Sequence, residues 1–255
     1  MDNVVFVGMG LASTLALPMV IKAQGINARY VCTVLPNEEA SQFRLVKDVE
    51  IALNIKIEDI GLGKTPLQLF REQKFIANSL HDSCSRVLKR ERALQFMKTE
   101  YPSGANIYIG IGAHEIDREL SIVKNWAASG YAVKMPLIDM KWINTPMLMS
   151  LCEKMFGYIP ELYKHGFAHG NCHGACVKAG IKQWVKLYEI YPDVYRQWEE
   201  TEEYVREHTG KDVSMLREMV KGVRRPLTLK RLREERMGEE YPEDKNTGCR
   251  HCEAI

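Results

Sequence analysis

The sequence lacks the features of several protein classes. No apolar run approaches the roughly 20 residues that a membrane-spanning helix needs, so a membrane protein is not indicated. The opening residues, MDNVVFVGMG, include no cationic segment and no signal-cleavage pattern, and we therefore expect a cytoplasmic protein. A net charge of only +2 gives no global electrostatic reason to expect a nucleic-acid partner.

The composition is otherwise that of an ordinary globular protein. The chain has 255 residues, 45% of them hydrophobic and 27% charged, which suffices for one large core without disulfide support. Its seven cysteines are an odd number. In a reducing compartment they are better explained by metal binding, chemistry or burial than by a disulfide framework. For Cys32 and Cys152, which lie in apolar segments, we expect burial.

The first half alternates β-branched runs with helical patterns. The runs are NVVFVG, ARYVCTV, IKIEDI, NIYIGIG and YAVKMPLI. Helical patterns cover residues 13–24, 38–54, 66–77, 85–98 and 115–128. Strands separated by helices of this length form right-handed βαβ units. The pattern predicts a doubly wound α/β domain over residues 1–145, with a mainly parallel sheet in a Rossmann-like α/β/α sandwich.

Strand signals stop after Pro146. Helical patterns then occupy residues 147–156, 177–191, 194–209, 213–221 and 228–237. We therefore expect residues 146–255 to form a helical, Cys/His-rich C-terminal appendage that packs on the first domain, without a second sheet.

The turn after the first strand, VGMGLAST, is a candidate phosphate site. Gly8 and Gly10 would let the backbone approach a phosphate, and Ser13 and Thr14 open a helix whose amino end attracts anions. The turn lacks both the third glycine of the dinucleotide fingerprint and the Gly-Lys-Ser/Thr ending of a P-loop. A tight turn without a ligand is therefore the alternative.

This loop resembles a variant PP-loop of the adenine nucleotide α-hydrolase-like superfamily. It is most similar to phosphoadenosine phosphosulfate (PAPS) reductase-like proteins of the phage and bacterial type, in which a glycine-containing loop ends in a Ser-Thr pair. The loop departs from the common PP-loop motif at Val7, Met9 and Ala12. The resemblance implies nucleotide binding at Gly8, Gly10, Ser13 and Thr14.

The resemblance covers nearly the whole chain. FREQKFIANSLHDSCSRVLKRE looks like the family segment in which a Cys-Ser pair begins a basic helix, and YIGIGAHEIDR looks like the segment at a strand end. GFAHGNCHGACVKAGIKQW resembles a block typical of the phage-type proteins. The catalytic residues that the resemblance implies are Arg86, Lys89, Glu115 and Arg118.

Two groups of cysteines point to a metal. The stretch HGFAHGNCHGAC holds Cys172 and Cys176, four positions apart at an expected helix start, while Cys249 and Cys252 form a C-x-x-C near the C-terminus. Four thiolates suit a tetrahedral zinc or an iron-sulfur cluster, and Cys84 could replace one of them. The alternative is unpaired thiols beside a turn with incidental histidines. Cysteine-rich C-termini in proteins of this type favour a bound zinc or cluster.

The basic stretch from Lys221 to Arg236 has two interpretations. The simpler one is a solvated amphipathic helix with interspersed glutamates. The other is contact with RNA, DNA or a phosphorylated substrate, because Arg224 and Arg225 stand apart from compensating acids in the sequence.

Together these features predict an enzyme. The resemblance implies a cytoplasmic protein that binds ATP or PAPS and acts in sulfur transfer or sulfonucleotide chemistry on an unidentified acceptor, with a Cys-bound zinc or iron-sulfur cluster. The alternative is a nucleotide-binding scaffold with a structural zinc that has lost catalysis, which the replaced positions Val7, Met9 and Ala12 motivate.

Overall fold

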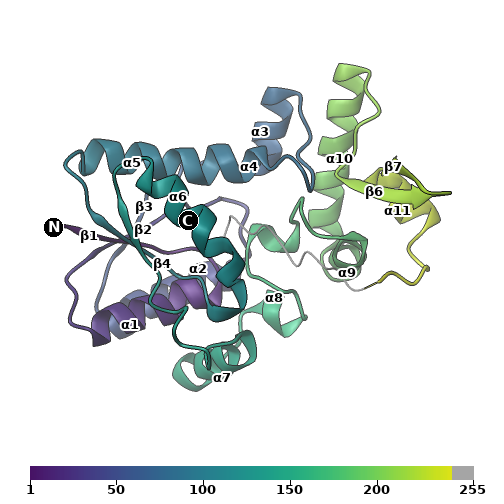
Figure 1. Ribbon diagram of the computed structural model, residues 1–255. Coiled ribbons are helices and arrows are strands. Elements are labelled where there is room, and N and C mark those ends of the chain that lie inside the picture. Colours follow the sequence, from purple (N-terminus) through teal and green to yellow (C-terminus); the bar gives the residue numbers. More distant parts are fainter. Residues whose placement is uncertain (243–255) are drawn as a thin grey trace.

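A five-stranded parallel sheet forms the centre of the first half of the chain (Figure 1). The structure is a computed structural model that describes residues 1–242, except for the side chains of His114 and Asp117. The strands are β1 (Asn3–Phe6), β2 (Arg29–Cys32), β3 (Ile57–Asp59), β4 (Asn106–Ile109) and β5 (Ala132–Lys134). Their order is β3-β2-β1-β4-β5, and all pairings are parallel. The predicted doubly wound fold is confirmed.

Helices cover both faces of the sheet (Figure 1). Successive strand residues point to opposite faces, so Val5 packs in one core with Tyr108 while Val4 and Phe6 pack in the other. The first core contains residues of η1 (Ala12–Ala16), α1 (Leu17–Ala23), α2 (Ala40–Leu53) and α7 (Thr145–Phe156). The second contains residues of α5 (Arg92–Glu100) and α6 (Glu119–Ala127). The remaining elements of this half are α3 (Pro66–Gln73), α4 (Ser83–Ser85), η2 (Arg86–Glu91) and η3 (Ala113–Arg118).

Local sequence signals set several of these helix ends. Thr65 caps α3 in a capping box with Gln68, and Asn144 caps α7 by accepting from the Met147 amide. A proline follows each cap, where its fixed φ suits the first helical turn.

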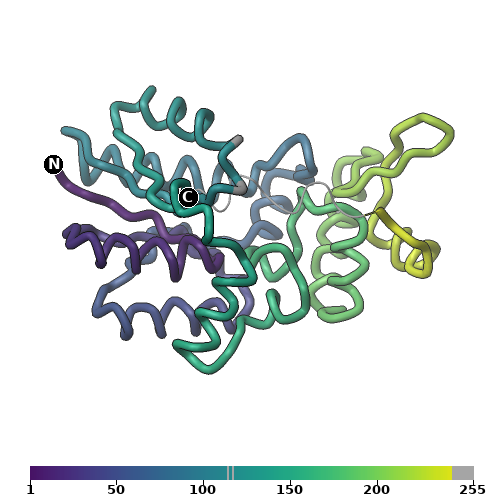
Figure 2. Tube along the Cα trace, turned by 60° about the horizontal axis from the view of Figure 1, so that its bottom comes forward, coloured from purple at the N-terminus to yellow at the C-terminus, as the bar shows by residue number. Residues whose placement is uncertain are grey.

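The C-terminal region lies beyond the carboxyl ends of the strands (Figures 1 and 2). It contains α8 (Glu161–Lys164), η4 (Cys172–Gly174), α9 (Ile181–Ile190), α10 (Pro192–Thr209) and α11 (Leu229–Glu235). Its core is aromatic: the rings of Trp184 and Trp198 lie 5.7 Å apart between centroids, and Phe70 of α3 lies 6.0 Å from Trp198. Helix α3 therefore joins the C-terminal core although it belongs to the first half of the sequence.

The helix expected at residues 213–221 is wrong. The chain instead forms an antiparallel hairpin of β6 (Leu216–Val220) and β7 (Val223–Leu227). At its tip Lys221 and Gly222 have φ values of 49° and 78°, and two left-handed residues are what a two-residue type I′ turn requires. Burial alternates along β6 from Leu216 to Met219, as expected for a strand with one covered face.

A buried carboxylate fastens both ends of this hairpin. Glu202 of α10 accepts the amide of Met215 at 2.7 Å and that of Leu229 at 2.6 Å. These two residues come just before β6 and just after β7. Burial raises the pKa of Glu202 to about 8, against the opposing effect of the two amides.

Two further expectations concerned the burial of two cysteines and the lack of a membrane-spanning helix. Cys32 and Cys152 are both buried, as predicted, and burial raises the pKa of the Cys32 thiol to about 12. Within residues 1–242, no helix combines the length and apolarity needed to cross a membrane.

Candidate functional site

The strand order marks one crevice as the first place to look for a ligand. From β1 the chain moves outward through β2 to β3, then returns to β4 on the other side of β1. In open parallel sheets, ligands bind outside the carboxyl ends of the strands at such a reversal. Here the crevice is flanked by the glycine loop after β1 and by the segment that follows β4.

The glycine loop lies at this crevice, and its hydroxyl groups stabilise the loop itself. Thr14 Oγ1 donates to the Gly8 carbonyl at 2.7 Å, and Ser13 Oγ donates to the Gly10 carbonyl at 3.2 Å. Both side chains are buried. The Leu11 amide donates to the Tyr163 hydroxyl at 3.1 Å. Contacts from this loop to a ligand would therefore come from backbone groups.

A buried ion pair lies at the same edge of the sheet. Lys89 Nζ is 4.0 Å from Glu38 Oε1, and these side chains are 3% and 0% exposed. Glu38 also accepts the backbone amides of Cys172 and His173. Burial raises the pKa of Glu38, and Lys89 and the two amides oppose that shift. The pair thus joins the segment after β2, the helix after α4 and the Cys/His-rich loop.

The Cys/His-rich loop does not start a helix, contrary to expectation. Cys172, His173 and Gly174 have φ values of 56°, 51° and 78°, three left-handed residues in succession. Non-glycine residues in this conformation cost about 1–2 kcal/mol each, and such strain is concentrated at functional sites. A Cβ on Gly174 would lie 2.7 Å from the Phe167 ring, so glycine is required there on two grounds. Cys172 and Cys176 are both buried.

His169 is a neutral imidazole inside this site. Burial, reinforced by the positive charge of Lys89, lowers its pKa to about 4. Its Nδ1 atom accepts the Asn171 amide at 3.3 Å, and its buried Nε2 atom has no hydrogen-bond partner among the described residues.

Buried polar atoms without hydrogen-bond partners are concentrated in three segments around this edge. Within the described part of the chain they include side-chain atoms of Asn37, Glu38, Gln42, Ser83, Ser85, His169, Asn171 and His173. Buried polar groups are normally paired, and a ligand or an ordered water is one explanation when they are not. This concentration is the strongest sign of a binding site in the described residues.

The residues that the resemblance named divide into two groups. Lys89 lies in the buried site, and Arg118 is buried and bonded to Glu115 after β4, next to the crevice. Arg86 is different, because its side chain is 55% exposed and pairs with Glu91 at 2.6 Å. The structure therefore brings Lys89 to the buried cluster and leaves Arg86 at the surface.

Glu38 was not anticipated from the sequence. A single glutamate after a strand carries no motif, although its place just beyond the carboxyl end of β2 is a position where functional groups gather. Gln42, whose side chain packs against Gly170 of the Cys/His-rich loop, was missed for the same reason.

Half of the expected metal ligands can be located. Cys172 and Cys176 belong to the same buried cluster as Cys84, whereas Cys249 and Cys252 lie outside the described residues. Within residues 1–242, no group of three or more His, Cys, Asp or Glu side chains is arranged to hold a metal ion. His165 of the same stretch is 40% exposed and pairs with Glu161.

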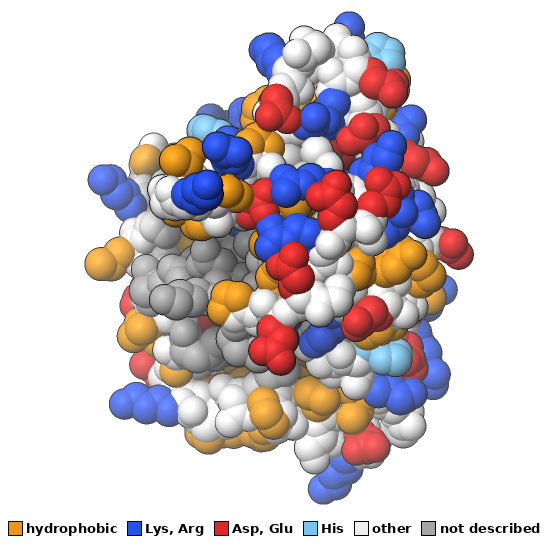
Figure 3. Space-filling view, turned by 90° about the vertical axis from the view of Figure 1, so that its right-hand side faces the viewer, with side chains coloured by type: hydrophobic (Ala, Val, Ile, Leu, Met, Phe, Trp, Pro, Cys, Tyr) orange, Lys and Arg blue, Asp and Glu red, His pale blue; other side chains and the backbone are white. Residues whose placement is uncertain are grey.

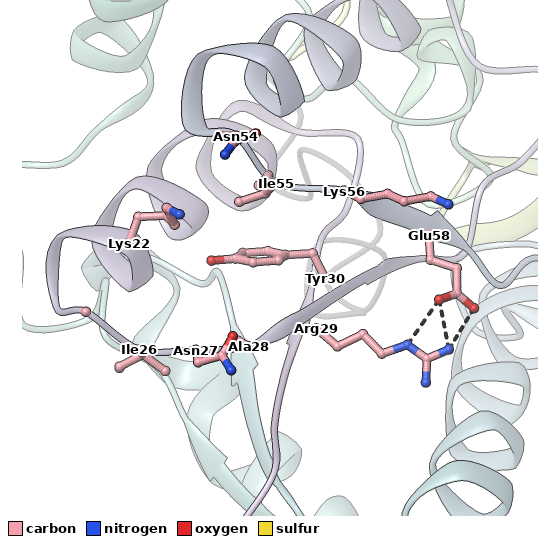
Figure 4. A pocket seen from close by; sticks show the side chains of 11 residues that line it. Lys22, Ile26, Asn27, Ala28, Arg29, Tyr30, Asn54, Ile55, Lys56 and Glu58 are labelled. Carbon is pink, nitrogen blue, oxygen red and sulfur yellow. Dashed lines mark hydrogen bonds and ion pairs between the residues drawn. The ribbon is translucent and has the colours of Figure 1, made fainter.

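The opposite edge of the sheet carries a surface cavity of about 590 Å³ (Figure 4). Its lining includes the exposed side chains of Lys22 and Lys56 around the ring of Tyr30. Arg29 beside it is paired with Glu58 at 2.8 Å and with Glu100 at 2.9 Å. This cavity lies at the amino ends of the strands, away from the crevice.

Comparisons with known proteins identify no relative: no family model, no curated protein and no solved structure matches the chain.

Proposed function

We propose that the protein binds an adenine nucleotide, ATP or PAPS, in the crevice between the carboxyl ends of β1 and β4. The observation that carries this proposal is the reversal of strand order at that crevice, next to which Lys89 and Arg118 are both buried. Buried cations at a sheet edge suit phosphate groups, because the low dielectric there strengthens their attraction for anions.

The roles of the chain's own groups follow from their positions. Backbone groups of the glycine loop, with Gly8 and Gly10, contact the phosphates. Lys89 and Arg118 neutralise the charge that develops during transfer, and Glu115 orients Arg118 by its ion pair. Glu38 fixes the left-handed turn at Cys172 and His173 through their amides.

The reaction class that fits this arrangement is sulfur transfer or sulfonucleotide chemistry. With ATP, an acceptor oxygen attacks the α-phosphorus and releases pyrophosphate, after which sulfur or nitrogen displaces AMP. With PAPS, a cysteine thiolate attacks the sulfonate sulfur and releases adenosine 3′,5′-bisphosphate, after which a second thiol displaces sulfite and a disulfide remains. Both thiols must be free of metal.

A zinc ion or an iron-sulfur cluster is part of this proposal. Cys172 and Cys176 would hold it together with Cys249 and Cys252, and Cys84 shares the buried cluster of the first two. Two buried thiols in one loop are suitable donors for either group. When bound, a cluster can carry activated sulfur, whereas zinc stabilises the fold.

One observation favours a second candidate function, a nucleotide-binding scaffold without catalysis, with zinc in a structural role. The hydroxyls of Ser13 and Thr14 and the amide of Leu11 are all engaged within the protein. A loop with fewer groups left for phosphates would bind a nucleotide without stabilising pyrophosphate as it leaves.

Calorimetric titration with ATP, AMP and PAPS tests the proposal, together with an assay of pyrophosphate release. The double variant Lys89→Met/Glu38→Gln removes the cation without leaving a buried charge alone. The matched control is Lys98→Met, at an exposed position of α5, which directly follows η2. We expect nucleotide affinity to fall by about 30-fold or more in the first and not in the second.

Three outcomes separate the possibilities. Binding of ATP with pyrophosphate release supports the enzyme. Binding without release, and without sulfonucleotide reduction, supports the scaffold. A correctly folded wild-type protein that binds none of the three nucleotides overturns both.

A further inference from the structure

The basic stretch between Lys221 and Arg236 is divided by the structure into two unlike parts. On α11, the arginines are held by glutamates: Arg231 by Glu218 at 2.6 Å and Arg233 by Glu199 at 2.8 Å. Arg236, which follows α11, also bonds to Glu218. These cations stabilise the C-terminal region and are not available to a partner.

The hairpin cations are not paired in this way. Arg217, Arg224 and Arg225 are exposed, and none of them has an acidic partner among residues 1–242. The hairpin contains four cations and a single acid, Glu218, which is 6% exposed and already bonded to two arginines. All of its exposed charged side chains are therefore cationic, and Met219 and Val223 are exposed apolar neighbours.

Figure 3 looks onto this end of the molecule. Some of the Lys and Arg side chains on this face are surrounded by hydrophobic side chains, whereas others alternate with Asp and Glu. The second arrangement is typical of mutually neutralised surface charges, whereas the first leaves a positive potential toward solvent.

A groove leads from the hairpin toward the candidate site. It has a volume of about 280 Å³ and is lined by four cationic side chains. These are Lys178, Lys182, Arg217 and Arg224. Lys178 also pairs with Asp82 at 3.2 Å, two residues from Cys84 in the sequence, and it follows Cys176 by the same interval. The groove thus continues from the hairpin to the segment that carries the buried cysteines.

We propose that this hairpin and groove bind the phosphodiester backbone of a nucleic acid, which carries the acceptor for the chemistry at the sheet edge. The inference rests on the proposed function for the acceptor's role, but not for the binding itself. The exposed arginines of the hairpin, followed by Lys178 and Lys182 along the groove, match a chain of regularly spaced phosphates better than a single small anion. The hairpin has no Phe, Tyr or Trp, so base stacking does not contribute there, and binding is independent of base sequence.

Fluorescence anisotropy with labelled 20-nucleotide probes tests this proposal. The probes are duplex DNA, single-stranded DNA and single-stranded RNA of mixed sequence, each titrated at several salt concentrations. The variant is Arg217→Gln/Arg224→Gln. The matched control is Lys22→Gln/Lys56→Gln, which removes the same charge from the exposed cavity at the opposite edge of the sheet.

We expect the hairpin variant to bind at least one probe about ten-fold more weakly at 100 mM salt. The slope of log K against log salt should decrease by about 1.5, as expected for two lost phosphate contacts. The control variant should keep the wild-type slope. The three probes show whether DNA or RNA is preferred.

Three results would overturn the proposal. One is no binding of any probe by the wild-type protein, another is an equal loss in both variants, and the third is charge-dependent binding to vesicles with 30% phosphatidylserine but not to nucleic acid. Calorimetric binding of ATP, AMP and PAPS to the hairpin variant separates this failure from that of the proposed function. Loss of nucleic-acid binding with intact nucleotide affinity concerns the hairpin alone.

Discussion

The two edges of the parallel sheet differ in how far their polar groups are buried and paired. At the amino edge, Arg29 is matched by Glu58 and Glu100, and this ion pair is partly exposed. At the carboxyl edge, Lys89 and Glu38 are almost fully buried, and polar atoms of Gln42 and other residues have no hydrogen-bond partner among the described residues.

This difference is the one expected between an edge that serves only the fold and an edge that binds a ligand. Leaving buried polar groups unpaired costs about 1–3 kcal/mol each, so a fold keeps them only where something else gains. At the amino edge, within the described residues, the buried Tyr30 hydroxyl also lacks a partner, so the two edges differ in how many such groups they hold.

The largest effect should come from breaking the buried ion pair. We expect Lys89→Met to lower the free energy of unfolding by about 3–5 kcal/mol, because it leaves the Glu38 carboxylate buried without its cation. Arg29→Met at the amino edge should cost about 1 kcal/mol or less. Urea unfolding measures both. Equal losses would show that the two edges do not differ.

The next largest effect should be a loss of stability at acidic pH. The folded-state pKa of His169, about 4, lies below the ordinary value of 6.5, so the unfolded state binds more protons between these pH values. The free energy of unfolding should therefore fall as pH decreases from about 6.5 to about 4, by about 3 kcal/mol.

The variant His169→Gln should remove this part of the pH dependence in chemical unfolding measured from pH 4 to pH 7. The exposed His165 supplies the control, and His165→Gln should leave the wild-type profile as it is. An unchanged profile in His169→Gln would mean that His169 is not held neutral by its surroundings.

A smaller effect should follow from the close packing of the Cys/His-rich loop. A Cβ at residue 170 would lie 2.6 Å from Gln42 Nε2, and Gln42 is 1% exposed and has no room to move into solvent. We expect Gly170→Ala to lower the free energy of unfolding, measured by thermal unfolding, by about 1–3 kcal/mol. At the amino edge, Gly25 has open space around it and a φ of 69°, which asparagine tolerates. Gly25→Asn should lower the free energy of unfolding by about 0.5 kcal/mol or less. A larger loss in Gly25→Asn than in Gly170→Ala would contradict the close packing around Gly170.

The sheet could be predicted from the sequence because its strands are short β-branched runs separated by helical patterns. The helices could be predicted where caps such as Thr65 and Asn144 mark their starts. The hairpin could not, because Lys221-Gly222 is a weak turn signal compared with Asn-Gly, and the left-handed Lys221 is not visible in the sequence.

The candidate site was predictable only in part. Position after a strand end located the glycine loop, and the family resemblance pointed to Lys89. The partner of Lys89, however, is 51 positions away in the sequence and has no motif around it. Spacing also failed at Cys172, because an interval of four residues is equally compatible with a helix and with the left-handed turn that forms. Which cations are neutralised depends on tertiary contacts, as the contrast between Arg224 and Arg231 shows.

The attachment of the hairpin has an evolutionary consequence. Glu202 holds Met215, just before β6, and Leu229, two residues after β7, so both ends of the segment from Leu216 to Leu227 are fixed by a residue outside it. Most of this segment is exposed, so its sequence and even its length can drift while the frame persists. The hairpin is in effect an exchangeable insert, because its exposed surface can be replaced while its attachment to α10 is kept.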